Sequence, residues 1–300
     1  MIVDVHTHLP THEDEVPEND VKFESIMRSG EAVRITNSVD DYLAAMSPVD
    51  KSFLFDIAPR TGKAGGGTLE NIYPLAKYVW ADGMNHNDIA SAIARRAPDR
   101  VIPFMSLHPY DADWKSEYDR AVGDLDCRGI KLAPNYQNFD PISDEAFELF
   151  ARLQTDGIPV IFHQGTSPMW DAPLTYTHPL TSDRVAMAFP KLKMVLAHLG
   201  HPWHADCAAV VRKHPNVWAD VSGQFYRPYS FWQGMRLWYE WGVTGKILFA
   251  SDWPLTNPQD NIDHLRGLGK FAKDHRLPKI PENEIEGIIN RDSLEILELE

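Results

Sequence analysis

Residues 2–8 read Ile-Val-Asp-Val-His-Thr-His, an apolar and β-branched run that ends in two histidines. Runs of this kind predict a β-strand, in which residues i and i+2 point to the same face. His6 and His8 therefore present both imidazoles from one face of the predicted strand, which makes half of a metal site. Spacing alone leaves an alternative open, in which these are two polar residues at a strand end and one of them faces solvent.

The same kind of run recurs along the chain and gives eight predicted strands. They cover residues 2–9, 51–58, 101–107, 129–133, 159–163, 193–198, 217–221 and 247–251. Their nearly continuous hydrophobicity favours strands that are buried on both faces, as in a parallel sheet. Stretches with helical spacing of apolar residues lie between most of them. The predicted helices cover residues 38–46, 87–96, 113–125, 143–157, 182–189, 204–213, 229–241, 261–274 and, after the last strand, 283–297.

The alternation of strands and helices predicts the fold class. Eight strands alternating with helices in 300 residues describe an α/β protein built as a (β/α)8 TIM-type barrel with a C-terminal helix. An open doubly wound sheet is the alternative, but it normally carries a glycine-rich phosphate turn after an early strand, and none is visible. The length would also accommodate two ordinary domains. Because no linker divides the chain, we expect one domain over residues 1–300.

Three more predicted strands end in a residue that can ligate a metal. His163 follows Val-Ile-Phe, His198 follows Val-Leu-Ala, and Asp252 follows Phe-Ala-Ser. Each alone has an ordinary interpretation, as a hydrogen-bonded core histidine or a capping aspartate. Together with His6 and His8 they all lie at carboxyl ends of strands, where barrel active sites form. Three histidines and an aspartate can surround one divalent ion and leave a position for water. Zinc is the expected ion, and manganese or another divalent ion accepts the same ligands.

Several other residues near strand ends are candidate substrate contacts. Lys131 lies within the apolar fourth strand, where a cation is costly unless it is paired. We interpret it as a carboxylate-binding cation, and the alternatives are a side chain that reaches out at the strand end or a modified lysine that bridges two metals. The other candidates are loop cations, an imidazole and two aromatic residues that could form an apolar wall, namely Arg60, Arg227, His201, Trp170 and Trp253. The two arginines could instead be surface charges, and the tryptophans could pack the barrel rim.

Composition limits the classes of partner that the chain is expected to bind. The chain has 29 Lys and Arg against 43 Asp and Glu, a formal charge of −14 with His neutral, so it repels nucleic-acid backbones. No apolar run reaches the roughly 18–20 residues that a membrane span needs. The two cysteines, Cys127 and Cys207, are far apart, which favours a reducing compartment such as the cytoplasm. A small molecule is the expected partner. The aromatic residues of helix 229–241 indicate core packing first and a homo-oligomer interface second.

Four motifs in their order along the chain resemble the amidohydrolase superfamily. They are Ile2-Val-Asp-Val-His-Thr-His8, Val160-Ile-Phe-His-Gln-Gly165, Val195-Leu-Ala-His-Leu-Gly200 and Phe249-Ala-Ser-Asp-Trp-Pro254. They are most similar to the branch that includes aminocarboxymuconate-semialdehyde decarboxylase and pyrone-dicarboxylate lactonase. Residues 212–223 and 288–297 resemble the seventh-strand region and closing helix of that branch. Arg291-Asp292 stands where an Asn-Ala pair is usual there.

The resemblance implies a distorted barrel with a single divalent metal, usually zinc. By analogy, the metal ligands are His6, His8, His163 and Asp252. His198 matches a histidine that orients the metal-bound water or contacts the substrate. Binuclear members of the superfamily use a carboxylated lysine on the fourth or fifth strand. Because this branch usually works with one metal, Lys131 is not assigned as a ligand.

These features predict an enzyme that hydrolyses an amide, a lactone or a related bond in a small molecule. A divalent ion lowers the pKa of bound water, Asp252 transfers the proton, and His198 holds the water or stabilises the oxyanion. The alternative is a carboxy-lyase, which would remove CO2 from an unsaturated or aromatic carboxylic acid without oxidation. That reaction also needs cations for carboxylates, and Lys131, Arg60 and Arg227 are the candidates. A third hypothesis, a non-catalytic barrel, would be marked by a lost ligand, and every expected ligand type is present.

Overall fold

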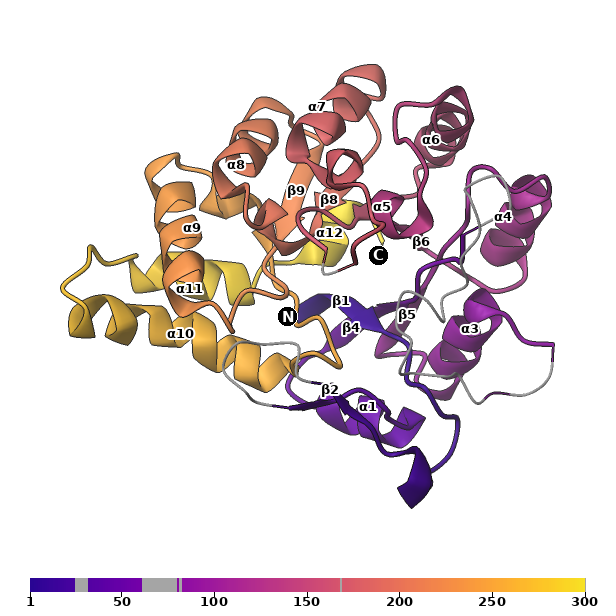
Figure 1. Ribbon diagram of the computed structural model, residues 1–300, viewed down its shortest axis with the longest axis horizontal. Helices are drawn as coiled ribbons and strands as arrows, with labels where there is room; N and C mark the ends of the chain where they lie inside the picture. Colours follow the sequence, from indigo (N-terminus) through magenta and orange to yellow (C-terminus); the bar gives the residue numbers. More distant parts are fainter. Residues whose placement is uncertain (25–31, 61–79, 81–82, 168, 300) are drawn as a thin grey trace.

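Eight parallel strands form the centre of the molecule, and the helices surround them (Figure 1). The computed structural model describes residues 1–24, 32–60, 80, 83–167 and 169–299. The central strands are β1 Val3–His8, β4 Lys51–Phe55, β5 Val101–Met105, β6 Gly129–Leu132, β7 Val160–Phe162, β8 Met194–Leu196, β9 Val217–Asp220 and β10 Ile247–Leu248. Each of the eight predicted strands is therefore confirmed.

The helices also follow the sequence signals. The α-helices are α1 Val39–Ala45, α3 His86–Arg96, α4 Trp114–Gly123, α5 Pro134–Gln137, α6 Asp144–Asp156, α7 Pro179–Ala188, α8 His204–Lys213, α9 Pro228–Glu240, α10 Pro258–Asp274, α11 Glu282–Ile289 and α12 Ser293–Leu297. Single 3-10 turns occur at η1 Glu18–Asp20, η3 Leu174–Thr177, η4 Ala197–Gly200 and η5 Thr244–Lys246. Helix α6, for example, begins after a cap by Ser143, whose side chain accepts from the Ala146 amide, and ends at Gly157 with φ +72°.

The strands follow one another around the sheet in chain order, from β1 to β10. Beside β10 and just beyond it, main-chain hydrogen bonds join the last strand to the first. The amide of Val5 donates to the carbonyl of Phe249 at 3.1 Å, and that of His8 donates to Trp253 at 2.9 Å. The amide of Asp252 donates to the carbonyl of His6 at 2.9 Å. The sheet is therefore a nearly closed (β/α)8 barrel, which confirms the predicted fold class.

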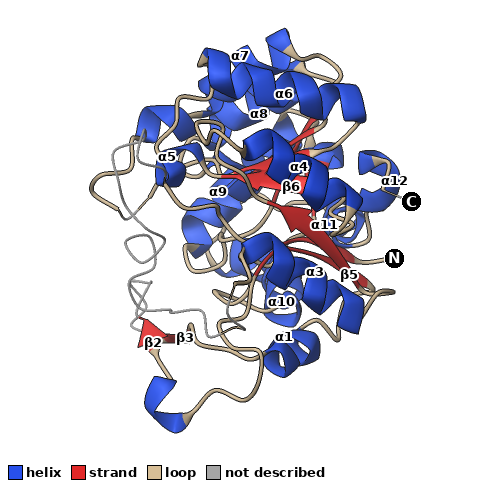
Figure 2. Ribbon diagram, turned by 90° about the vertical axis from the view of Figure 1, so that its right-hand side faces the viewer, coloured by secondary structure: helices blue, strands red, loops and turns tan. Residues whose placement is uncertain are grey.

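Apolar side chains fill the inside of the barrel. Phe53 and Phe104 stack there with ring centroids 4.5 Å apart. Gly129 permits this packing, because a Cβ at its position would lie 2.1 Å from the Phe104 ring. Leu294 and Leu297 of α12 belong to the same cluster. Figure 2 shows α12 and both termini at one end of the molecule, with α5 at the opposite end. Helix α12 therefore packs against the amino-terminal end of the barrel.

Two features differ from the sequence expectations. The single helix predicted over residues 283–297 is wrong, because α11 ends at Ile289 and α12 begins at Ser293. Asp292 separates them by capping α12, and its side chain accepts from the amides of Leu294 and Glu295. The predictions also did not include the antiparallel pair of β2 (Phe23–Glu24) and β3 (Val33–Arg34).

Two further observations concern the cysteines and the helices. Cys127 and Cys207 are free, buried thiols. Within the described ranges, no helix is long and apolar enough to cross a membrane.

Candidate active site

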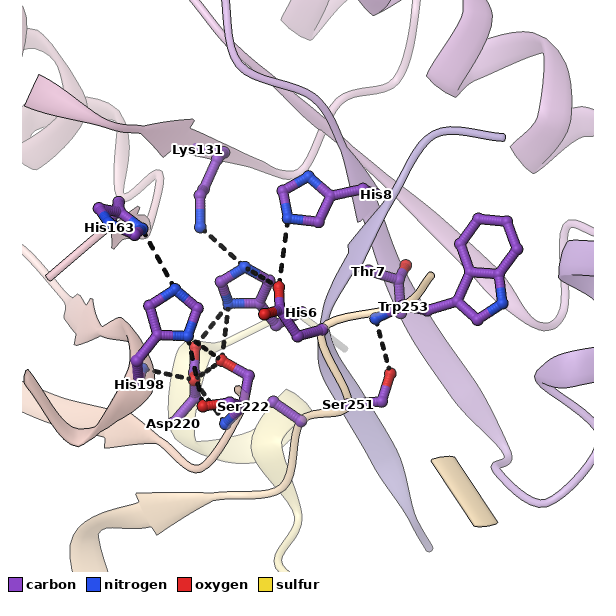
Figure 3. A network of polar contacts seen from close by, with 12 residues as sticks. His6, Thr7, His8, Lys131, His163, His198, Asp220, Ser222, Ser251 and Trp253 are labelled. Atoms are coloured by element: carbon purple, nitrogen blue, oxygen red, sulfur yellow. Dashed lines mark hydrogen bonds and ion pairs between the residues drawn. The ribbon is translucent and has the colours of Figure 1, made fainter. Parts of the chain in front are cut away.

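His6, His8 and Asp252 meet at the carboxyl end of the barrel, from β1 and from the turn after β10 (Figure 3). Nε2 of His6 and Nε2 of His8 each lie 3.4 Å from Oδ1 of Asp252. This separation is long for a hydrogen bond, but about 3.4 Å is the edge of a tetrahedron of ligands roughly 2.1 Å from a central ion. The three side chains could therefore hold a metal ion together.

Asp220, at the end of β9, orients His6 from behind. Nδ1 of His6 lies 2.9 Å from Oδ2 of Asp220, and a carboxylate only accepts hydrogen bonds. Nδ1 of His6 therefore carries the hydrogen, and Nε2 keeps its lone pair toward Asp252. Carboxylates commonly fix the tautomer of metal-binding histidines in this way.

His6, His198 and Asp220 form a second group with donor atoms close enough to hold a metal. The hydroxyl of Ser222 already links these three residues. Its Oγ lies 2.8 Å from Nδ1 of His198 and 3.3 Å from Nδ1 of His6, and it contacts Oδ1 of Asp220. Nδ1 of His6, the nitrogen that faces Asp220 in this second group, carries a hydrogen and has no lone pair for a metal, and we therefore place the candidate metal in the first group.

His163 and His198 face each other at the ends of β7 and β8. Nδ1 of His163 lies 3.1 Å from Nε2 of His198 (Figure 3). The ring of Tyr136 also lies next to His163, with the two ring centroids 4.6 Å apart. The structure thus places His163 next to His198. His163 is not in the group of closely spaced donor atoms, which consists of His6, His8 and Asp252.

Lys131 lies beneath these histidines, and its side chain is fully buried. Its Nζ donates to Nε2 of His6 at 3.0 Å and lies 4.8 Å from the centroid of the Phe55 ring. Among the described residues, no carboxylate oxygen lies within ion-pairing distance of this ammonium. Burial lowers the pKa of Lys131 to about 8, although the negative charges of Asp220 and Asp252 act in the opposite direction.

The imidazoles and carboxylates of the site differ in charge. Burial, followed by the charge of Lys131, lowers the pKa of His6 to about 3, and burial also lowers the pKa of His163 and His198. Burial alone would raise the pKa of Asp252, but its hydrogen bond with His8 and its other site contacts hold the pKa below the usual range. His6, His163 and His198 therefore present neutral imidazoles and Asp252 an ionised carboxylate, which are the forms that bind metals.

Arg60 lies in the loop after β4, at the side of the site that contains Tyr136. Its Nε donates to the carbonyl of Tyr136 at 2.7 Å, and its Nη1 pairs with Asp171 at 2.6 Å. The Arg60 side chain is only 5 % exposed, and Nη2 is buried with no hydrogen-bond partner in the described part of the chain. Within the described residues, this nitrogen is left for a further hydrogen bond.

Arg227 and His201 lie on the opposite side, in the loops after β9 and β8. The guanidinium of Arg227 stands 4.2 Å from the centroid of the Tyr226 ring. Burial, followed by the charge of Arg227, lowers the pKa of His201 to about 3. Nδ1 of His201 is buried and has no partner among the described residues. His201 thus interacts electrostatically with His198 of the site and with Arg227.

The two predicted aromatic contacts lie elsewhere. Trp253 is buried, and its ring packs 5.1 Å from that of Tyr42, on the side of β1 away from the histidines (Figure 3). Trp170 is 97 % exposed. The structure therefore does not bring either indole together with the metal-ligating group.

Sequence reasoning missed Asp220, Ser222 and Tyr136. Asp220 had a usable signal, because it ends the seventh apolar run in the same way that Asp252 follows the eighth. Ser222 lies in the stretch 212–223 that resembles the family branch, but that resemblance gave it no role, and Tyr136 lies in ordinary loop sequence.

Comparison with known proteins gives a family and several related folds. A family model described as amidohydrolase matches residues 3–289. No curated protein matches the chain. Among solved structures, 2,6-dihydroxybenzoate decarboxylase from Rhizobium shares 16% identity, with 99% of this chain and 98% of that chain covered and a TM-score of 0.62.

Two further structures have similar values. A probable 2-pyrone-4,6-dicarboxylic acid hydrolase from Acinetobacter baumannii, with citric acid bound, has 14% identity, coverage of 99% of both chains and a TM-score of 0.61. A dihydroxybenzoic acid decarboxylase from a Polaromonas species, with bound manganese and 2-nitroresorcinol, has 16% identity, coverage of 99% and 97%, and a TM-score of 0.61. At these identities the likeness concerns the fold, and it agrees with the nearly closed barrel.

Proposed function

Because the chain belongs to the amidohydrolase family, we propose that it is a metal-dependent decarboxylase of a small unsaturated or aromatic carboxylic acid. The sequence favoured hydrolysis as the first reading and decarboxylation as the alternative. Two of the three structures compared above are decarboxylases of hydroxybenzoic acids, which supports the alternative better than the first reading. The remaining support comes from the charges of the site.

The proposed metal ligands are His6, His8 and Asp252, with His163 as a fourth ligand on the resemblance of its motif. Two imidazole nitrogens and a carboxylate oxygen accept zinc and manganese alike, so the donor set fits either ion. A bound divalent ion would fix an anionic oxygen of the substrate and draw electron density from the reacting carbon. Structures with this fold contain manganese, which makes manganese the first ion to test.

The observation that carries the proposal is the buried cation Lys131. A buried ammonium without a carboxylate partner is costly, and an anionic ligand beside it would remove that cost. In the described part of the chain, its only hydrogen-bond partner is Nε2 of His6, at 3.0 Å. A carboxylic acid supplies the missing negative charge, whereas a neutral amide or ester does not. We therefore propose a carboxylate as the substrate group at this position.

The chain also offers a group for the proton that decarboxylation requires. The reaction breaks the bond between carbon and the carboxylate, releases CO2 and leaves an electron pair on carbon, which must take up one proton. Nε2 of His198 lies on the side of His163 and is proposed to take up a proton from solvent and then to deliver it to the carbon. Because burial lowers the pKa of His198, its protonated form gives up the proton more readily than an exposed histidine would.

Arg60 is proposed to hold a second polar group of the substrate, since its Nη2 is buried without a described partner. Arg227 and His201 are proposed contacts from the other side of the barrel. A second acidic or phenolic oxygen on the substrate would suit the two guanidinium groups, because both donate and neither accepts hydrogen bonds.

Hydrolysis of a lactone or amide stays as a second candidate. Asp252 is held ionised next to the proposed metal ligands, which suits a general base for water. A structure with this fold is a probable 2-pyrone-4,6-dicarboxylic acid hydrolase, and that compound also carries carboxylates. Lys131 would therefore have the same anion-binding role in both reactions.

The test uses the purified chain with manganese or zinc, offered hydroxybenzoic acids and a pyrone dicarboxylate. We expect CO2 release with loss of the acid, and we expect Asp252→Asn to abolish it together with stoichiometric metal binding. Lys131→Met should lower kcat/KM by about 100-fold, since loss of a buried charge partner costs several kcal/mol. Lys115→Met, at an exposed lysine of α4, serves as the matched control. Ring opening of the pyrone without CO2 would favour the hydrolase instead, and full activity of Lys131→Met would refute the anion-binding role.

A further inference from the structure

His198 has an unusual main-chain conformation. Its φ and ψ are 61° and 26°, those of Leu199 are 49° and 22°, and Gly200 has φ +67°. Three consecutive residues are thus left-handed, although side chains other than glycine disfavour this region. Non-glycine residues keep such a conformation only where the surrounding structure imposes it, and such residues cluster at functional sites.

The segment Asp220–Gln224, which begins at the last residue of β9, holds His198 at three separate atoms. Oδ1 of Asp220 accepts from the main-chain amide of His198 at 3.0 Å. Nε2 of Gln224 donates to the main-chain carbonyl of His198 at 2.8 Å. Oγ of Ser222 lies 2.8 Å from the ring atom Nδ1. The amide, the carbonyl and the ring are therefore all fixed from one segment, by residues at alternate positions.

Gly223 lies between these contacts and allows the segment to come close. It has φ +65°, and a Cβ there would lie 3.1 Å from both Nδ1 of His198 and Oδ2 of Asp252. A larger residue would press directly on the two groups that face the substrate position. The sequence Asp-Val-Ser-Gly-Gln over 220–224 thus combines three polar contacts with one position that must stay small.

The hydrogen bonds also have a defined direction. The hydroxyl of Ser222 contacts Oδ1 of Asp220, and because the carboxylate can only accept, the hydroxyl hydrogen goes to Asp220. Ser222 Oγ must then accept at its other contact, so Nδ1 of His198 carries a hydrogen. Nε2 is left as the nitrogen that exchanges protons, and it is the one that faces His163 and the site.

We infer that the Asp220–Gln224 segment is a positioning device for His198, with Ser222 and Gln224 as its positioning residues. It holds the strained main chain in place, keeps the hydrogen on Nδ1 and thereby directs Nε2 toward the substrate. The catalytic consequence rests on the proposed function, in which Nε2 of His198 donates the proton. The position of the hydrogen on Nδ1 does not depend on that function.

The first experiment measures the hydrogen position directly. ¹⁵N NMR of histidine-labelled protein is recorded without metal and with manganese replaced by diamagnetic zinc, and the His198 signals are assigned by their loss in His198→Gln. We expect a hydrogen on Nδ1 in the natural chain and a mixture of ring tautomers in Ser222→Ala. Ser222→Thr keeps the hydroxyl and should restore the Nδ1 hydrogen. A natural chain whose His198 carries its hydrogen mainly on Nε2 would overturn the inference, whether or not any variant folds.

The second experiment measures catalysis on whichever carboxylic acid the substrate test above identifies. Ser222→Ala should lower kcat by about 10–100-fold with KM changed less than about threefold, and Ser222→Thr should recover most of kcat. Bound metal should stay stoichiometric in all three proteins. A kcat loss in Ser222→Ala that excess metal repairs would assign Ser222 to His6 rather than to His198, and would refute the inference. If no acid is turned over, the proposed function fails, and the NMR result alone decides the positioning role.

Discussion

Asp4 lies two residues before His6, and its carboxylate is fully buried. Oδ1 accepts from the amides of His6 at 3.1 Å and Ser251 at 2.9 Å, and Oδ2 has no partner among the described residues. Burial raises the pKa of Asp4 from 3.8 to about 7. We predict that this single residue makes the stability of the metal-free protein depend on pH.

The direction follows from proton binding. Between pH 3.8 and about 7 the folded state keeps a proton on Asp4 that the unfolded state has released, so the free energy of unfolding falls as the pH rises. From pH 5 to 7 this amounts to about 2–3 kcal/mol. Urea unfolding of the natural chain and of Asp4→Asn at both pH values is the measurement. The free energy of unfolding of Asp4→Asn, relative to that of the natural chain, should be higher at pH 7 than at pH 5. An unchanged difference between the two proteins would contradict the buried, protonated Asp4.

At this scale the sequence predicted part of the site. His6, His8 and Asp252 were predictable because strand geometry places alternate residues on one face and strand ends on one rim. Trp253 was expected at the same rim, but its neighbour Tyr42 comes from α1, and no local pattern indicates which side of the strand an indole takes. The contacts of Ser222 with His6 and His198 join residues up to 216 positions apart, which spacing cannot predict.

Helix α12 has five residues and contributes two buried leucines to the core. Leu297 is fully buried in the cluster that fills the lower barrel. We predict that Leu297→Ala lowers the free energy of unfolding by about 3 kcal/mol, through lost burial and the cavity left behind. Glu295→Ala, at an exposed position of the same helix, is the control and should change it by less than about 0.5 kcal/mol. Equal effects of the two substitutions in chemical denaturation would mean that α12 does not pack as described.

Most elements were predictable because their signals are local. Ser38 and Ser143 mark helix starts, and both cap their helices. The break before α12 was missed because apolar residues occur on both sides of the polar residues 290–292, and the capping by Asp292 reveals two helices. The pair of β2 and β3 has two residues in each strand, which is too short for any periodicity.

The whole molecule brings the two ends of the chain together at the proposed metal site. His6 and His8 belong to the first strand, and Asp252 follows the last. The ligand set therefore exists only when the barrel is closed, and metal should bind the folded state alone. We predict that manganese or zinc at about 1,000 times its Kd raises the free energy of unfolding by about 4 kcal/mol.

Thermal unfolding with increasing metal, and after removal by a chelator, measures this stabilisation. Asp252→Asn is the matched variant, because it removes one proposed ligand oxygen while keeping the shape of the side chain. Its melting temperature should hardly respond to the metal. A natural chain that is equally insensitive would exclude the proposed ligand set, and an equal response of both proteins would place the metal elsewhere.

The order of the eight strands was the most predictable property of the whole molecule, since a barrel of parallel strands joined by helices pairs neighbours in chain order. The way the barrel closes was not. It depends on three main-chain hydrogen bonds beside and beyond β10, two of them in residues 252–253, where a strand pattern has already ended.

Helix α12 also affects how small molecules reach the candidate site. Leu294 and Leu297 fill one end of the barrel, so among the described residues we expect small molecules to enter at the rim of histidines. If entry and exit share this rim, product must leave before the next substrate molecule can bind. Substrate and product would then use the same passage, and we expect product release to limit turnover together with the chemical step.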